Sequence, residues 1–301
     1  MRPAFIFWAT FMFVSFVSAY VPNRKTTAAA SKSYNINAPL YGQNELMIAL
    51  AMVTGNTDAT PAGSRSDFSG FATKIDYSYG LNDFIAPFFA QSYFNLEQAV
   101  TNPKTDINQK GIGSTKLGFK GVISFKKPYL NYEISYTAGI FNRASSNCKN
   151  TSCDLAPVGE RPNISMLGGA GMPYGLFDFG TQLAYLLYQD GDNEFTGSNI
   201  RTTTKYKSGT GLTFEVYAQL NMGWKLGVTY SEKKIDEFNT VTSGITSISN
   251  TSTDTFITGY GILYFGSANE AILSVAKQDN KEATTTKYNL FQVIATYRRI
   301  F

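Results

Sequence analysis

Ionisable and amide side chains recur at alternate positions along several segments, and they are the groups in this chain that could do chemistry. The set comprises Lys74, Asp76, Lys116, Lys120, Glu133, Asp178, Gln182, Glu215, Lys225, Gln292 and Arg298. General acid–base or nucleophilic catalysis would normally place a histidine beside a serine, an acid or a water molecule, and the chain contains no histidine. Paired carboxylates could replace the histidine, but the acids alternate with lysines, and an ion-pair network explains them better. We therefore expect no enzyme and no cofactor.

The two cysteines are the other reactive groups. Cys148 and Cys153 lie in one polar stretch, and a metal site would need further cysteine or histidine ligands. In a secreted protein a disulfide between them is the expected state, where it would contribute roughly 2 kcal/mol by restricting the unfolded loop. Lysines and arginines are scattered over the chain and the net charge is +4, so no nucleic-acid partner is expected.

The segments that carry these groups alternate with a period of two. From Phe71 to Leu81, with Thr73 as the exception, and from Leu130 to Ile140, apolar residues occupy every second position and polar or glycine residues occupy most of the positions between. This period predicts strands with one apolar and one polar face. Charged residues make up 16% of the chain, below the roughly 25% of soluble domains, which favours strands in a membrane.

The spacing of the breaks selects the fold class. Short turns, such as 81–83 and 126–128, alternate with long polar connections, such as 55–67 and 97–111. A membrane barrel sorts its connections in this way, whereas a sandwich has no reason to do so. We expect an all-β, antiparallel transmembrane barrel of about twelve strands, with ten or fourteen still possible. The predicted strands are 44–54, 68–81, 84–96, 112–126, 129–141, 161–172, 176–188, 206–220, 224–234, 255–265, 270–278 and 287–301.

Aromatic residues flank the short turns, among them Tyr79, Phe125, Tyr129 and Trp224. Amphipathic rings prefer the boundary between lipid and water, so these residues predict an interfacial girdle. Ordinary cross-strand packing in a sheet would give the same pattern.

The N-terminus reads as a secretory signal. One positive charge at Arg2 precedes an apolar run, and Val17-Ser18-Ala19 supplies the small residues of a cleavage site. The run is too short for a membrane anchor. We expect a signal peptide at 1–19, a periplasmic segment at 20–40 that could instead form a short plug, and a barrel at 41–301.

The last strand carries a family resemblance. Phe291, Val293, Ala295, Tyr297 and Phe301 share one face. In this the chain resembles bacterial outer-membrane β-barrel proteins, whose final strand alternates apolar residues and ends in an aromatic one. The resemblance implies location in the outer membrane, contact with its lipid, and recognition of Tyr297 and Phe301 by the barrel-assembly machinery. Arg299 departs from the pattern, although its side chain can snorkel to the interface.

The predicted inner face suggests the function. Eight strands enclose a filled interior and sixteen to eighteen an open channel, so about twelve leave room for a narrow polar passage. We expect a porin-like channel through which small hydrophilic solutes pass passively, lined by the eleven residues named first. The alternatives are that these residues only satisfy one another in a closed interior, or that the barrel is structural and binds partners through its outer loops.

Overall fold

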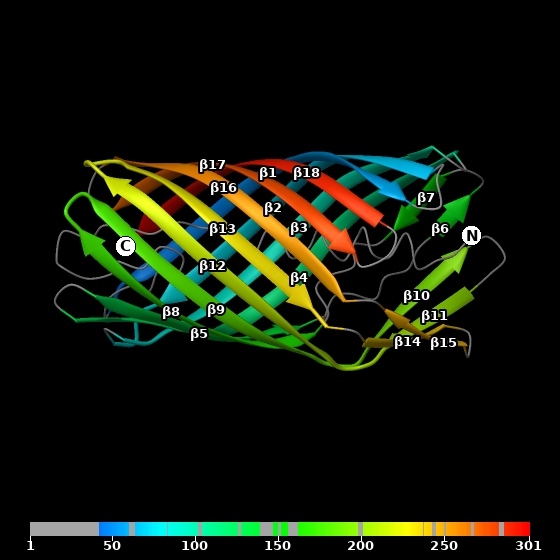
Figure 1. Cartoon of the computed structure of the whole chain (residues 1–301), viewed down its shortest axis with the longest axis horizontal. Coiled ribbons are helices and arrows are strands. Elements are labelled where there is room, and N and C mark those ends of the chain that lie inside the picture. The colour runs from blue at the N-terminus through cyan, green and yellow to red at the C-terminus, as the bar shows by residue number, and fades with distance from the viewer. Residues whose placement is uncertain are drawn as a thin grey trace.

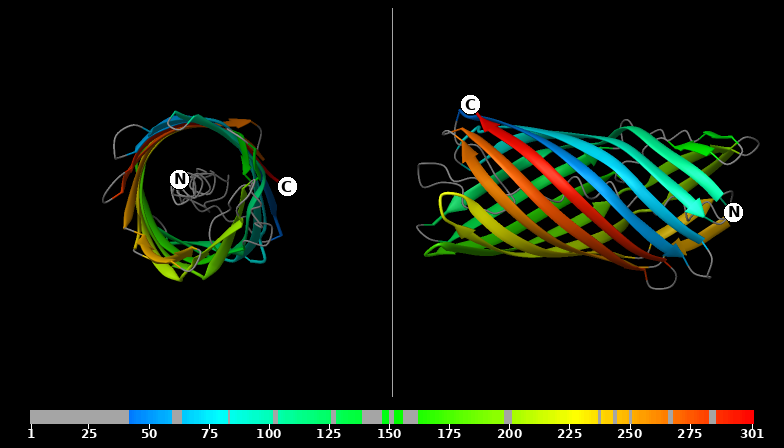
Figure 2. Two further views of the ribbon diagram at one scale, coloured as in Figure 1. Left: turned by 90° about the vertical axis from the view of Figure 1, so that its right-hand side faces the viewer. Right: turned by 90° about the horizontal axis from the view of Figure 1, so that it is seen from above.

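Twelve long strands form the wall of a closed antiparallel barrel (Figures 1 and 2). The computed structural model describes residues 42–59, 64–82, 84–101, 104–125, 128–138, 147–149, 152–155, 162–197, 201–236, 238–242, 245–249, 251–265, 268–282 and 286–301. The wall strands are β1 (Asn44–Ala59), β2 (Ser64–Tyr79), β3 (Ala86–Thr101), β4 (Lys104–Ser124), β5 (Tyr129–Ala138), β8 (Asn163–Tyr174), β9 (Phe177–Tyr188), β12 (Gly209–Asn221), β13 (Lys225–Ile235), β16 (Ser252–Phe265), β17 (Asn269–Glu282) and β18 (Thr286–Ile300). All twelve predicted strands are therefore confirmed.

The barrel closes where its first and last strands meet. β1 pairs with β2 on one side and with β18 on the other, in a register that runs from Glu45 opposite Ile300 to Ala59 opposite Thr286. Figure 2 shows the last strand running beside the first. We call this β1–β18 contact the seam.

Six shorter strands extend the wall at the end with the long connections, here named the loop end. They are β6 (Asn147–Lys149), β7 (Ser152–Leu155), β10 (Gly191–Gly197), β11 (Arg201–Tyr206), β14 (Phe238–Thr242) and β15 (Ile245–Ser249). β7 pairs in parallel with β4, β6 pairs in parallel with β10, and β11 pairs with β14. The long loops predicted at 55–67 and 97–111 are wrong, because β1–β2 and β3–β4 run through most of both. These segments lack apolar alternation since neither face of the extension meets lipid.

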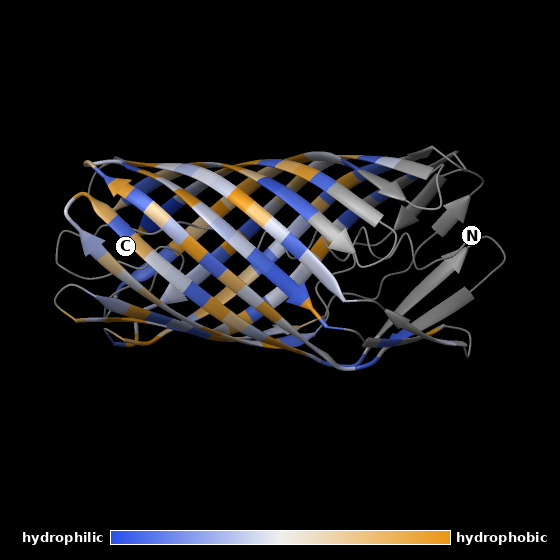
Figure 3. Ribbon diagram, in the orientation of Figure 1, coloured by the Kyte–Doolittle hydropathy of each residue, from blue (hydrophilic) through white to orange (hydrophobic). Residues whose placement is uncertain are grey.

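Burial alternates along each wall strand and separates two faces. On β1, Ile48, Leu50 and Met52 are 40 to 65% exposed on the outside, whereas Ala49 and Ala51 face inward and are buried. Figure 3 shows the alternation as bands of opposite hydropathy along the strands. The exposed residues form an apolar belt. On β9 its exposed apolar residues run from Phe177 to Tyr185, and the partly exposed Leu187 ends it. From Phe177 to Leu187 is about 33 Å along the strand, or about 25 Å along the barrel axis for a strand tilted by ~40°, close to a hydrocarbon core.

At the opposite end of the barrel, here named the turn end, tight turns connect consecutive strands. Gly175 and Gly223 adopt φ values of 61° and 80° between β8 and β9 and between β12 and β13, a conformation that favours glycine. Exposed aromatic residues surround these turns, including Phe84, Tyr174 and Trp224. No helix in the described ranges is long and apolar enough to cross a membrane.

Candidate functional site

The eleven polar residues predicted to line the lumen all lie on the inner face. Their strand positions alternate with those of the exposed apolar belt, and their side chains are buried or nearly so. Glu215 and Gln182 are directly opposite each other on β12 and β9, and Lys225 begins β13. Several of the others join two groups of contacts, the charged arc and the tyrosine arc. Whether they line a path for solutes remains a proposal.

The charged arc follows the inner wall from β17 through the seam to β5, near the turn end. It contains Lys74, Lys116, Lys120, Arg298, Glu45, Asp76, Glu133 and Glu270. Four bases face four acids, so the arc is formally neutral.

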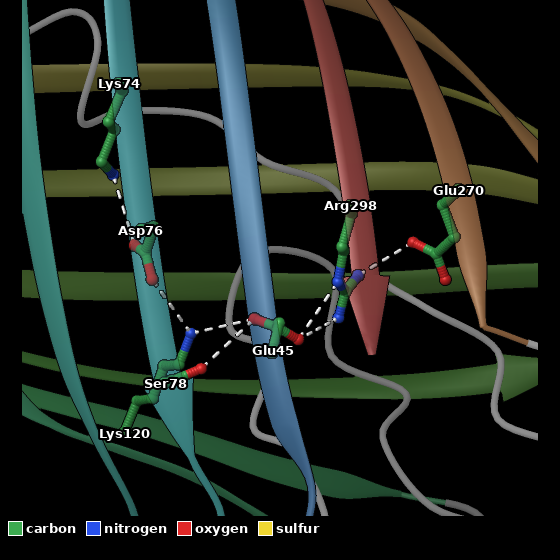
Figure 4. Close-up of polar contacts among 7 residues, drawn as sticks. All are labelled: Glu45, Lys74, Asp76, Ser78, Lys120, Glu270 and Arg298. Carbon is green, nitrogen blue, oxygen red and sulfur yellow. Dashed lines mark hydrogen bonds and ion pairs between the residues drawn. The ribbon is translucent and has the colours of Figure 1, made fainter. Parts of the chain in front are cut away.

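Glu45 is the centre of the charged arc (Figure 4). Its Oε2 accepts hydrogen bonds from Arg298 Nη2 at 2.8 Å and from Arg298 Nε at 3.1 Å across the seam. Its Oε1 accepts from Lys120 Nζ at 3.2 Å, and Arg298 Nη1 donates to Glu270 Oε2 at 3.0 Å. One carboxylate on the first strand therefore joins the last strand to β4.

Small and flat side chains allow Lys120 to reach across three strand positions. Ser78 lies beside Glu45 on β2, and Ala86 lies opposite Lys120 on β3; neither is exposed to solvent. The Phe88 ring lies 5.6 Å from Lys120 Nζ and 5.7 Å from Lys116 Nζ, as a cation–π platform. Beyond it, Lys116 pairs with Glu133 at 2.5 Å. The charged groups are thus held along the wall.

The tyrosine arc occupies the facing part of the wall, from β5 to β16. Tyr129 donates to Asp178 Oδ1 at 3.0 Å and contacts the Tyr217 hydroxyl. Gln219 Nε2 donates to Asp178 Oδ2 at 2.9 Å, and Tyr260 donates to Gln219 Oε1 at 3.0 Å. The interfacial position predicted for Tyr129 is wrong, because its ring is on the inner face and fully buried. Its hydroxyl contacts Asp178 and Tyr217 on that face.

Glycines bring the tyrosine rings against the wall. A Cβ on Gly180 would lie 2.2 Å from the Tyr217 ring, and a Cβ on Gly227 would lie 2.2 Å from the Tyr260 ring. Only glycine permits such an approach without a shift. In both arcs, the contacts described here join strands no more than three positions apart, so they run around the wall.

Part of the inner face is apolar, contrary to the uniformly polar lining expected. This apolar patch comprises Ala49, Ala51, Val53, Ala72, Phe94, Leu96 and Ile294. It lies on β18, β1, β2 and β3, next to the charged arc on its loop-end side. Gln292, one of the eleven predicted residues, lies within it, opposite Val53.

Several members of the arcs were missed by sequence reasoning. Glu45 lies near the start of a strand whose other buried inner positions are Met, Ala and Val, and the position after Glu270 on the inner face of β17 is Ile272, so the facing of neither acid was evident. Tyr217 and Tyr260 are aromatic residues at inner positions. The only sequence feature that could have indicated this is the glycine opposite each of them on the neighbouring strand.

The remaining predicted features are placed as far as the described residues allow. Tyr297 and Phe301 are exposed on the outer face, and the Tyr297 hydroxyl donates to Asn269 Oδ1 at 2.7 Å. Cys148 and Cys153 are backbone partners in the β6–β7 hairpin. Their side chains lie outside the described part, as do 1–19 and 20–40, so the disulfide, the signal peptide and the N-terminal segment remain predictions.

Solved structures with the same architecture belong to bacterial outer-membrane proteins. An outer-membrane channel from Pseudomonas putida F1 matches with a TM-score of 0.63 at 14% identity, over 88% of this chain and 97% of the channel. The transport unit of the autotransporter AIDA-I from Escherichia coli matches with a TM-score of 0.57 at 9% identity, over 97% of both chains. The translocator domain of the autotransporter NalP from Neisseria meningitidis matches at 0.50 and 12% identity, over 98% of this chain and 95% of that domain.

No protein-family model and no curated protein matches the sequence. The structural similarity therefore concerns the fold, and the apolar belt agrees with it. The chain has the fold of the bacterial outer-membrane β-barrel proteins, and the outer membrane is its location.

Proposed function

We propose that the barrel is a passive channel for small hydrophilic solutes of little net charge. The observation that carries the proposal is the arrangement of the long inner side chains. Lys120 and Arg298 are tied to strands within three positions, and Tyr217 and Tyr260 lie on glycines, so all four follow the wall and not the axis. A barrel that only needed a filled interior would gain more from apolar packing across its axis than from buried ion pairs.

The balance of positive and negative charges in the charged arc indicates the class of solute. Because the charged arc holds four acids and four bases, it offers no net attraction to either sign of ion. Alternating charges at close quarters still provide hydrogen-bond donors and acceptors along the wall. Uncharged or zwitterionic solutes suit this lining better than simple anions or cations.

A second candidate is a structural barrel that binds partners outside the cell. The β10–β11 and β14–β15 hairpins carry the wall beyond the apolar belt, which supplies a surface for contacts. Two of the similar structures are the translocator domain of one autotransporter and the transport unit of another.

Single-channel recording in planar bilayers separates the two candidates. We expect a steady conductance, with a reversal potential near zero in a salt gradient. A Lys116→Cys variant, at an inner-face side chain that is 20% exposed, should lose conductance on treatment with a charged thiol reagent. The adjacent Leu117→Cys variant on the lipid side is the control and should not. Both variants are made with Cys148 and Cys153 replaced by serine. A folded barrel without conductance would favour the structural role.

A further inference from the structure

The apolar patch contains no hydroxyl-bearing side chain, unlike a second buried apolar cluster of the inner wall, in which three tyrosines lie with Val122, Ile262 and Ile272. On β1, Ala49, Ala51 and Val53 face inward while Leu50 and Met52 face lipid, so both faces of the strand are apolar. A strand that lines a water-filled barrel normally alternates apolar outside with polar inside. Ala72, Phe94 and Ile294 continue the patch onto the neighbouring strands. The inner surface here is therefore suited to an apolar group.

Unpaired polar atoms lie beside this patch. Gln98 occupies the inner position that follows Leu96 on β3, is 4% exposed, and has no hydrogen-bond partner for either amide atom. Gln292, opposite Val53 across the seam, is 2% exposed, and its Nε2 has no partner. By contrast, Gln219 in the tyrosine arc uses both of its amide atoms.

Leaving a buried amide unpaired costs stability, because the group has lost its water and gained nothing in exchange. Such groups persist in native proteins where they have another role. Two of them border one apolar surface, and each can donate a hydrogen bond, while Gln98 can also accept one. Together they have the composition of a ligand site, with apolar area for affinity and a few polar groups for orientation.

We propose that the apolar patch with Gln98 and Gln292 is a binding site for a small uncharged molecule that has one apolar face and one amide-like or hydroxyl edge. An ionised ligand is disfavoured, because none of the seven patch residues carries a charge that could replace its lost hydration. The charge on Lys74, opposite Ala49, is already paired with Asp76. The site rests on the proposed function, since a solute that enters from the loop end would meet it before the charged arc. The charged arc follows it, because Glu45 precedes Ala49 on the same strand.

The test uses benzamide, whose ring matches the patch and whose amide can both donate to and accept from Gln98. Purified barrel is placed in lipid nanodiscs, and benzamide binding is titrated by saturation-transfer NMR, with empty nanodiscs to subtract partition into lipid. Acetamide, which has the same amide without the ring, should bind at least tenfold more weakly. In the Gln98→Leu/Gln292→Leu variant, the affinity for benzamide should fall by at least tenfold.

For the same variant, we expect the melting temperature and the affinity for benzamide to change in opposite directions. Leucine removes the unpaired amide atoms, so the ligand-free melting temperature should rise while binding falls, the signature of residues kept for function. Gln189→Leu is the matched control, because Gln189 is exposed outside the inner wall and should change neither binding nor stability greatly. Val53→Thr gives a second approach, since a hydroxyl in the patch should weaken benzamide binding severalfold at nearly constant volume.

Two results would overturn the site. One is unchanged benzamide affinity in both the double variant and Val53→Thr. The other is a lower melting temperature in the double variant, which would mean that the amides are structural. Binding in nanodiscs does not depend on conductance, so a barrel that binds benzamide but carries no current would reject the channel and retain the site.

Discussion

Replacing Glu45 with glutamine should destabilise the barrel strongly, because this carboxylate joins three strands. The change keeps the side-chain shape but removes one charge from the neutral arc. Arg298 would retain Glu270 at 3.0 Å, and Lys120 would retain Asp76 at 3.7 Å. Removing one partner of a buried ion pair costs about 3–5 kcal/mol. Because both bases keep one acid, we expect a loss in the free energy of unfolding of about 2–4 kcal/mol.

The assay is urea unfolding in lipid vesicles, followed by the fluorescence of Trp224. Asp279→Asn is the matched control, because it breaks the Lys277–Asp279 pair, which has the same kind of 3.0 Å contact but half-exposed side chains. That variant should lose no more than about 1 kcal/mol. A double-mutant cycle of Glu45→Gln with Arg298→Met should give a coupling energy of about 1–3 kcal/mol. Equal small losses in Glu45→Gln and Asp279→Asn, with no coupling, would refute the role of Glu45 as the centre of the arc.

Three further predictions concern the wall and its ends. Gly180→Ala should lower stability by about 1–3 kcal/mol, because its Cβ meets the tyrosine arc, whereas Gly168→Ala, with nothing within 4 Å, should be close to neutral in the same urea titration. Deletion of Phe301 should reduce the amount of protein assembled in the outer membrane, as measured by fractionation and immunoblotting; normal levels would show that the terminal aromatic residue is incidental. Cys148 and Cys153 should appear as one linked species in mass spectrometry without reduction, and free thiols on the native protein would contradict the disulfide.

The strand pattern could be predicted because the wall has lipid on its outer side and polar groups on much of its inner side. Lipid outside imposes an apolar residue at every second position, and this period locates all twelve wall strands. The pattern weakens where lipid ends, so the extensions of β1–β2 and β3–β4 read as loops. Their polar residues are compatible with strands only because neighbouring strands continue beside them.

The site was less accessible from the sequence, because pairing across the wall is not a local property. The alternation places Lys116 and Lys120 on the inner face, but it does not show that each already has a carboxylate partner. Replacing both lysines with glutamate would set like charges against Glu45 and Glu133, so it would test folding as much as ion selectivity. The apolar patch was hidden for another reason, since alanine and valine fit either face of a strand.

The ion pairs at the seam also decide how the barrel wall can open sideways. Parting β18 from β1 at the turn end would separate Arg298 from Glu45 and turn both charges toward hydrocarbon, where an isolated charge is far more costly than in water. At the level of the apolar patch, the same two strands bring Gln292 and Ile294 opposite Val53 and Ala51, so separation there exposes no charge. Lateral exchange with the bilayer is therefore blocked at one end of the seam by electrostatics and resisted further along mainly by the backbone ladder. A molecule that left the barrel through its wall would meet its lowest barrier above the charged arc.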